Sequence, residues 1–486
     1  MAVVTPLAQI LRPNCHADVT WKERDLEFPL LQPMDRVACY TPSTIPTEVA
    51  LRLNWIPALK ILLLLAISTC VAGTAQSPAT SVPSRTLVRA GHLLDVKSGK
   101  LLDNQTIVVV GDTIQSIGPS ASIDAQPGDR VVDLGSMTLL PGLIDVHTHL
   151  TGNPDFDPFK EVTDTDAKDA INGVVNARTT LLAGFTSVRN VGASGFVDVD
   201  LRDAINSGQM PGPHMLVSGP PLGITGGHCD ENLLPVQYHV VGDGVADGIA
   251  AVQHKVRENI KYGSDLIKIC ATGGVLSKGD DPQASQYTLE EMQAIVADAH
   301  RLGRKVAAHA HGAQGILWAT EAGVDSIEHG SYIDDAAIAE MKKRGTYLVP
   351  TLYLEDWMIQ SGHLPAIYQQ KMIDVSSVAK SNIKRAVQAG VKVALGTDAA
   401  VYPHGLNAHE LDVYVNQIGM TSLAALQTAT VNAADLMGWS TKTGSLEPGK
   451  WADMIAVGAN PLADIRVLQD VKFVMKGGVV YKGGQP

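Results

Sequence analysis

Cysteine is scarce in this chain, and so are aromatic residues and long runs of one charge. Only 5 of the 486 residues are Cys, and three of these lie within the first 70 positions. The other two, Cys229 and Cys270, cannot form a disulfide framework, so we expect free, buried thiols rather than a bridge. A chain of this length buries about three quarters of its unfolded surface. Any metal ion is therefore expected to be catalytic rather than structural.

No run of Lys or Arg is long enough to follow a phosphate backbone. The formal net charge is −12, from 38 basic and 50 acidic residues, which argues against a nucleic-acid partner. The chain also lacks an apolar run of about 20 residues, so no integral membrane span is expected. Its longest apolar block is ILLLLAISTCVA at 61–72.

That apolar block has the length and the flanks of a signal-peptide core. Arg52 and Lys60 precede it and the small residues of VAGTAQS follow it, so we expect cleavage after Ala75. We therefore predict that residues 1–84 are a leader and linker, with the signal-peptide-like segment at about 52–76. An exported protein, periplasmic or secreted, follows from this prediction.

Two further features of the leader bear on its processing. ISTC at 67–70 resembles a lipoprotein box, but Thr69 stands where Gly, Ala or Ser is expected, so a lipid anchor is the weaker interpretation. About fifty residues precede the apolar block, and no Met lies between Met34 and Met137. We expect translation to begin near residue 50, from a codon other than that of Met.

The two ends of the remaining chain share the character of short β-strands. Residues 85–140 hold alternating apolar runs with a hairpin signal at Gly111 and Asp112, and residues 443–486 repeat this character. We expect both ends to meet and build one small β-sandwich domain.

The middle of the chain, residues 141–442, alternates strand-like apolar runs with helical stretches such as TLEEMQAIVADAHRLG and DAAIAEMKKRG. The eight runs are GLIDVHTH, TSVRNVG, HMLVSG, DLIKICATGG, KVAAHAHG, VDSIEHG, TYLVPTLY and VKVALGTDA. Eight such units predict an α/β fold, a (β/α)8 TIM-type barrel. Active sites of these barrels lie at the carboxyl ends of the strands.

Polar side chains gather at these predicted strand ends. They are His147, His149, His309, His311, His329 and Asp398, with Lys268 inside an apolar run. Each alone has an ordinary explanation, such as a hydrogen-bonded core residue, a snorkelling amine or a turn cap. Together they predict a metal site, because imidazole and carboxylate groups are common ligands of Zn²⁺. A buried ammonium is unfavourable, so Lys268 is expected to be neutralised or modified, and a carbamate derived from CO₂ would make it an anionic ligand.

This set of residues resembles the metal-dependent amidohydrolases with a binuclear centre and a carbamylated lysine. The resemblance covers residues 85–486 and includes HTH at 147–149, NAADLMG at 432–438 and GSLEPGKWADMIAV at 444–457. A finer resemblance is to the imidazolonepropionase-like branch that contains Xaa-Pro dipeptidases, carboxypeptidases releasing a C-terminal residue, and ochratoxin-hydrolysing amidases. It is carried by SGPPLGITGGHCD, CATGGVLSKGDDPQASQYTLEE and AAHAHGAQGI.

The resemblance implies two divalent metal ions, with Zn²⁺ favoured and Mn²⁺ or Co²⁺ accepted by the same ligands. The implied ligands are His147, His149 and Asp398 for one ion, His309 and His329 for the other, and carbamylated Lys268 bridging both. A hydroxide shared by the two ions would attack the scissile carbonyl.

The resemblance also implies roles in catalysis and substrate binding. Asp398 would take the proton during attack and return it to the leaving amine, with Lys268 holding both metals. His311 is a candidate for polarising the substrate carbonyl or binding substrate, and His228 and Tyr353 are candidates for binding its carboxylate or acyl part. Simple pocket lining is an equally good explanation for these three. Asp145 is expected behind the ligands, orienting a histidine.

The implied reaction is hydrolysis of an amide or peptide bond that releases a C-terminal amino acid from a small peptide or an N-acyl amino acid. Ochratoxin A is a further candidate substrate. The resemblance implies a homo-oligomer, with an octamer among the assemblies to be considered.

Three alternatives stay open. A mononuclear deaminase would need Glu where Gly312 stands and would leave Lys268 without a role. An imidazolonepropionase-like hydrolase of cyclic amides would not need a leader peptide. A barrel used only for binding would have no need of a complete set of metal ligands.

Overall fold

The computed structural model describes residues 85–154, 157–362 and 364–484, and the statements below concern these. The predicted leader, residues 1–84, lies outside them. Among the described helices, none combines the length and the apolar character that crossing a bilayer requires.

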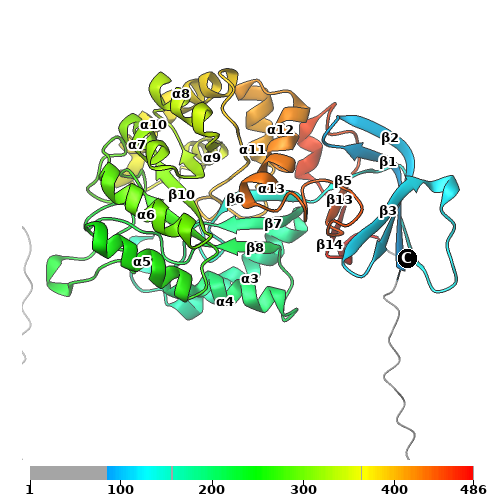
Figure 1. Cartoon of the computed structure of the whole chain (residues 1–486), viewed down its shortest axis with the longest axis horizontal. Helices are drawn as coiled ribbons and strands as arrows, with labels where there is room; N and C mark the ends of the chain where they lie inside the picture. Colours follow the sequence, from blue (N-terminus) through cyan, green and yellow to red (C-terminus); the bar gives the residue numbers. More distant parts are fainter. Residues whose placement is uncertain (1–84, 155–156, 363, 485–486) are drawn as a thin grey trace, which may run out of the picture. The chain divides into compact units, whose positions relative to one another are not determined.

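Strands from both ends of the described chain form one eight-stranded sheet. Its order is β15-β14-β13-β5-β1-β2-β3, with β4 also paired to β1. The strands are β1 (Arg85–Asp95), β2 (Lys100–Val110), β3 (Thr113–Pro119), β4 (Arg130–Asp133), β5 (Thr138–Pro141), β13 (Met454–Val457), β14 (Phe473–Lys476) and β15 (Val479–Lys482). Figure 1 shows the blue strands β1 to β3 near the red strands β13 and β14.

This sheet encloses a hydrophobic core of its own. Alternate residues of the strands face inward, and the core joins Ile114 of β3 to Met475 of β14, near opposite ends of the strand order. Ile114 N also donates to Lys450 O at 2.8 Å, just before β13. The sheet therefore wraps around one core, and the predicted meeting of the two chain ends is confirmed.

The middle of the chain forms two parallel sheets. One has the order β6-β7-β8 and the other β12-β11-β10-β9. Their strands are β6 (Leu143–Thr148), β7 (Phe185–Asn190), β8 (His214–Val217), β9 (Leu266–Cys270), β10 (Lys305–Ala310), β11 (Ser326–His329) and β12 (Tyr347–Val349).

Backbone hydrogen bonds connect the two sheets at both edges. The segment after β8 pairs with β9, where Leu222 N donates to Lys268 O at 2.8 Å. At the other edge, residues 391–399 form parallel bridges to β12 and β6, and Val146 N donates to Leu395 O at 2.9 Å. Residues 391–399 thus occupy the eighth strand position, and the α/β fold places all eight strand segments around one ring.

Helices follow the strands and cover the ring, as Figure 1 shows. The α-helices are α2 (Pro158–Glu161), α3 (Asp166–Leu182), α4 (Val197–Asn206), α5 (Ile249–Lys261), α6 (Leu289–Arg301), α7 (Ala313–Ala322), α8 (Asp335–Arg344), α9 (Tyr353–Ser361), α10 (Ala366–Gln388), α11 (His409–Val413), α12 (Ser422–Thr428) and α13 (Val431–Met437). The helical stretches TLEEMQAIVADAHRLG and DAAIAEMKKRG are confirmed as α6 and α8. A capping box between Thr288 and Glu291 begins α6, and α8 ends at Gly345, whose φ of 75° suits glycine.

Candidate metal centre

Two groups of side chains at the strand ends could each hold a metal ion. Within each group the potential ligand atoms all lie within 4.8 Å of one another. The groups are His147, His149 and Asp398, and His309, His311 and His329. They adjoin, because the ring centroids of His147 and His329 are 5.1 Å apart.

Each of the five histidines has one ring nitrogen held by a neighbouring group. Nδ1 of His147 lies 2.8 Å from Glu328 Oε2, and Nδ1 of His329 lies 2.7 Å from Thr351 Oγ1. The other three contacts are His311 Nδ1 to Ser331 Oγ at 2.8 Å, His149 Nδ1 to Gly192 O at 3.2 Å and His309 Nε2 to Gly273 O at 3.2 Å. Such contacts fix ring orientation and leave the second nitrogen of each ring available to a metal.

The electrostatics of the site favour the neutral form of three histidines and the ionised form of the carboxylate. Burial lowers the pKa of His311 to about 3, and it lowers the pKa values of His309 and His329 well below their ordinary value. Burial opposes ionisation of Asp398, but His147 and His149 hold its pKa well below the usual range. Neutral imidazole and charged carboxylate are the forms that bind divalent metals.

Three residues at this end of the ring have backbone angles that non-glycine residues rarely adopt. The φ angles are 69° at His329, 51° at Thr351 and 59° at Asp398. Left-handed backbone is strained for such residues and persists where surrounding structure enforces it. All three residues lie at or just beyond the ends of strand segments, and the strained backbone holds their side chains at the candidate metal centre.

Lys268 lies on β9 and is only 4% exposed. Burial lowers its pKa to about 8, while the charges of Glu328 and Asp398 raise it. Its own charge contributes to the lowered pKa of His309, so it lies within electrostatic reach of the histidines. A lysine with this pKa has a larger fraction of neutral amine near neutral pH, the form that reacts with CO₂.

Two buried charges beside the centre were missed in the sequence analysis. Glu328 on β11 is fully buried, and its carboxylate accepts from Arg189 Nη2 at 2.8 Å and from Ser326 Oγ at 2.5 Å. Burial would raise the pKa of Glu328, but Arg189 and His147 lower it to about 2. Both residues are charges inside apolar strand runs, the same signal that singled out Lys268.

Asp145 acts on the backbone of β6 rather than on a histidine ring. Its carboxylate accepts from His147 N at 3.1 Å, from Thr397 Oγ1 at 2.5 Å and from Asn407 Nδ2 at 2.7 Å. These contacts tie β6 to the eighth strand segment. The ring contact expected of Asp145 is made instead by Glu328.

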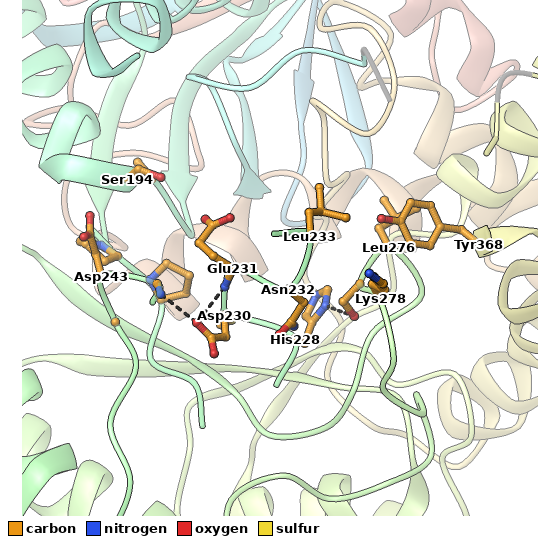
Figure 2. Close-up of a pocket in the computed structure, with 17 residues that line it drawn as sticks. Ser194, His228, Asp230, Glu231, Asn232, Leu233, Asp243, Leu276, Lys278 and Tyr368 are labelled. Atoms are coloured by element: carbon orange, nitrogen blue, oxygen red, sulfur yellow. Dashed lines mark hydrogen bonds between the residues drawn. The ribbon is translucent and has the colours of Figure 1, made fainter. Parts of the chain in front are cut away.

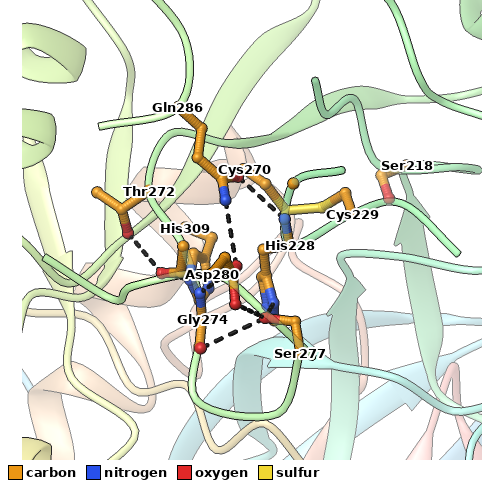
Figure 3. Close-up of a disulfide and its surroundings, with 12 residues drawn as sticks. Ser218, His228, Cys229, Cys270, Thr272, Gly274, Ser277, Asp280, Gln286 and His309 are labelled. Atoms are coloured by element: carbon orange, nitrogen blue, oxygen red, sulfur yellow. Dashed lines mark hydrogen bonds between the residues drawn. A yellow bond between two sulfur atoms is a disulfide. The ribbon is translucent and has the colours of Figure 1, made fainter. Parts of the chain in front are cut away.

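His228 lies in the loop between β8 and α5 and joins the cluster, as Figure 3 shows. Its ring centroid is 4.2 Å from that of His309, and its Nδ1 lies 2.9 Å from Ser277 Oγ. Ser277 donates to Asp280 at 2.7 Å, so a short polar chain holds His228 in place. A Cβ at Gly274 would lie 2.1 Å from His228 Nδ1, so only glycine allows this close approach.

A disulfide joins Cys229 to Cys270 beside this histidine. The expectation of two free thiols is therefore wrong. The two residues are 41 positions apart, but the pairing of Leu222 with β9 brings their Cα atoms to 6.1 Å. The bridge links the loop that carries His228 to the strand that carries Lys268.

Two cavities open at this end of the ring, and His228 and Leu276 line both of them. The inner cavity is lined by His309, His311, His329, Asp398, Glu355 and several apolar side chains. The outer cavity, shown in Figure 2, is lined by Asp230, Glu231, Asp243, Lys278 and Tyr368 among others. A substrate that reaches the histidines could therefore extend from one cavity into the other.

Tyr353 is the one predicted site residue that the structure does not bring to the cluster. It lines neither cavity, and its ring packs against those of Tyr402 and His409, with centroids 5.2 and 4.8 Å away. The other predicted residues, including His228 and His311, surround the inner cavity or lie directly behind it.

Comparison with known proteins agrees with this geometry. The model of the amidohydrolase family matches residues 138–481, which include both ligand groups. The ochratoxinase of Aspergillus niger is 36% identical over 431 residues, covering 82% of this chain and 87% of that protein. A solved Xaa-Pro dipeptidase with methionine bound in its active site has a TM-score of 0.78 and 40% identity, covering 82% of this chain and 100% of that one. A prolidase in complex with N-methylphosphonate-L-proline has a TM-score of 0.74 and 31% identity, over 82% and 100%.

Proposed function

Because this chain belongs to the amidohydrolase family, whose members hydrolyse carbon–nitrogen bonds, we propose that it cleaves an amide or peptide bond to release a C-terminal amino acid. The observation that carries the proposal is the pair of adjoining ligand groups beneath the inner cavity. The relatives support it, since one is named an ochratoxinase and others a Xaa-Pro dipeptidase and a prolidase. The proposed substrates are small peptides and N-acyl amino acids.

The donor set fits two divalent metal ions, with Zn²⁺ favoured by the imidazole ligands. The residues that would hold them are His147, His149, Asp398, His309, His329 and Lys268 as a carbamate. Two ions in such a site polarise the scissile carbonyl and make a bound water more acidic.

The chain's own residues would move the proton and hold the substrate. Ionised Asp398, on the strained turn at the end of the eighth strand segment, would accept a proton from the attacking water and pass it to the leaving amine. If Ser331 donates to His311 Nδ1, the His311 Nε2 proton is free to donate to the substrate carbonyl oxygen. Burial keeps His228 neutral by lowering its pKa to about 4, and because Ser277 donates to Asp280, the His228 Nδ1 proton is donated to Ser277. His228 would therefore contact the acyl part of the substrate with an Nε2 that accepts from an N–H group.

The place of action is part of the proposal. The segment at about 52–76 favours export, and a disulfide between Cys229 and Cys270 is typical of an oxidising compartment. A homo-oligomer is also proposed, and light scattering on the purified protein would measure its size.

A product screen tests the reaction itself. The metal-loaded protein is incubated with Xaa-Pro dipeptides, N-acyl amino acids and ochratoxin A, and mass spectrometry detects released amino acids. We expect release of the C-terminal residue from at least one class. A metal-loaded, folded protein that releases nothing from any class would contradict the proposal.

Two substitutions separate the proposed roles. Lys268→Ala should abolish loading with two metal ions, whereas Lys342→Ala on the exposed face of α8 should leave it unchanged. Full metal content and full activity in Lys268→Ala would refute the carbamate. His311→Asn should keep the metal content and lower kcat if His311 contacts substrate, and it should lose metal if His311 is a ligand.

A further inference from the structure

Glu355 is a buried acidic side chain in the inner cavity with an unsatisfied carboxylate oxygen. It lies in the first turn of α9 and is 5% exposed. Its Oε2 has no hydrogen-bond partner among the residues that the structure describes. It lines the inner cavity together with the histidines and Asp398. Buried polar atoms normally have partners, so an unpartnered oxygen on a side chain that lines this cavity calls for an explanation.

The charged groups around Glu355 are engaged elsewhere. Lys380, whose charge lowers the pKa of Glu355, forms an ion pair with Asp356 instead. Glu410, which repels Glu355, accepts from the backbone N–H groups of Leu352 and Tyr353 at the start of α9. Glu355 is therefore left without a counter-charge of its own.

The pKa of Glu355 agrees with this arrangement. Burial raises it to about 8, and Glu410 and Asp356 add to the rise against the opposing effect of Lys380. A positive group that pairs with the carboxylate would favour its ionised form and so offset the effect of burial.

The other walls of the inner cavity indicate which kind of ligand group would pair with Glu355. Beside the histidines and Asp398 its walls are largely apolar, with Val275, Leu354, Met372 and Val375 among them. An apolar group of a substrate would fit these walls but would leave Glu355 unpaired. A cationic group attached to such a substrate would pair with it.

The outer cavity has the matching charge. Asp230, Glu231 and Asp243 line it opposite one lysine, Lys278 (Figure 2). The outer cavity shares His228 and Leu276 with the inner one. An excess of negative charge beside a site raises the local concentration of cations and lowers that of anions. The outer cavity thus favours the same class of ligand as Glu355 itself.

We propose that Glu355 is a specificity-determining residue that binds a positively charged group of the substrate, an ammonium or a guanidinium. The inference rests on the proposed amide hydrolysis and specifies its substrate class. The charge has two possible sources, the free α-amino group of a peptide or a basic side chain. A substrate that lacks the charge would leave a buried carboxyl unpaired, so we expect it to be a poorer substrate by about tenfold to 100-fold in kcat/KM.

Matched substrates test the proposal on the metal-loaded full chain. The first pair is an unblocked dipeptide and its N-acetyl derivative. The second pair is an N-acetyl dipeptide containing Lys and the same peptide containing norleucine, with the residue placed at each position in turn. Wild type should prefer the charged member of at least one pair, and that pair identifies the source of the charge.

Glu355→Gln keeps the shape of the side chain and removes its charge. In this variant the ratio of kcat/KM for the charged and the uncharged member should lie within about twofold of unity. Glu355→Asp should lower the ratio to an intermediate value. The matched control, Glu290→Gln in the exposed first turn of α6, should keep the wild-type preference. Equal rates on both members of every pair in wild type would overturn the proposal, as would an unchanged preference in a folded Glu355→Gln protein. Loss of metal from that variant would also overturn it, because Glu355 would then be a ligand.

A binding measurement keeps this inference separate from the proposed reaction. Binding is measured by calorimetric titration with two pairs of compounds, which needs no turnover. The pairs are leucine with N-acetylleucine, and Nα-acetyllysine with Nα-acetylnorleucine. If a charged member of a pair binds more tightly and Glu355→Gln loses this difference, the cation site is supported. Absence of peptide cleavage would contradict the proposed reaction alone. Equal or absent binding of all four probes would overturn the cation site.

Discussion

Replacing Glu328 by glutamine tests whether the metal centre depends on a charge that touches no metal itself. Glu328 is fully buried and lies between two partners, the guanidinium of Arg189 and the ring of His147. Glutamine has nearly the same shape and keeps an amide oxygen for Arg189. It loses the negative charge that both partners face.

Two effects should follow from the loss of this charge. Arg189 is only 2% exposed, so the substitution leaves a buried cation without its counter-charge. Breaking a buried pair in this way costs about 3–5 kcal/mol of unfolding free energy. His147 loses the carboxylate that fixes its ring, and removing such a partner lowers metal affinity by about 10- to 100-fold.

Two assays separate these effects. Urea unfolding of the chelated protein measures the free energy of unfolding, and titration with Zn²⁺ measures the affinity. Glu340→Gln is the control, because Glu340 on α8 forms surface ion pairs with Lys343 and Arg344, and such solvent-screened pairs contribute little to stability. If Glu328→Gln matched this control in both assays, the assignment of Glu328 as the residue that positions His147 would be refuted.

Two further predictions concern the disulfide and the buried carboxyl group of Glu410. Reduction of the bridge between Cys229 and Cys270, which closes a loop of 41 residues, should destabilise the protein by about 4 kcal/mol and lower its Tm; a Tm that reductant leaves unchanged would speak against the bridge. Burial raises the pKa of Glu410 from 4.5 to about 8, so the folded protein retains a proton that the unfolded chain has released. The free energy of unfolding should therefore fall as the pH rises from about 4.5 to 8, by roughly 3–5 kcal/mol from this group. Glu410→Gln should lose less over that range in urea unfolding of the chelated protein, and an identical pH dependence in both proteins would contradict the assignment.

Much of the fold could be predicted because its information is local. An apolar run followed by a helical stretch indicates a strand and its covering helix within about thirty residues, and eight repeats predict a ring. The segment 391–399 shows a limit of this local pattern, because the pattern predicts a regular strand there. It is hydrogen-bonded on both sides, yet it makes only isolated β-bridges and no regular strand. The domain boundaries at residues 140 and 443 stay predictions.

The candidate ligands could be named for the same reason. A histidine at the end of an apolar run is visible in the sequence, and the parallel arrangement brings every such end to one face. The structure places His147 and His329 in adjoining groups. His147 also contacts Glu328, which lies 181 residues further along the chain. Tyr353 shows the limit of this argument, because an aromatic side chain just beyond a strand can turn to either side, and here it packs on Tyr402.

The sequence by itself determined the order of strands and helices, the strand-end histidines and the odd presence of Lys268 in an apolar run. Only the tertiary structure decided which distant groups meet. Arg189 and Glu328 are 139 residues apart, and Cys229 and Cys270 join through a loop that folds back along β9. The orphan carboxyl of Glu355 exists only because its neighbours are paired elsewhere. Local periodicity is set by the geometry of one element, whereas the partner of a buried charge is set by packing between elements, which a single sequence does not display.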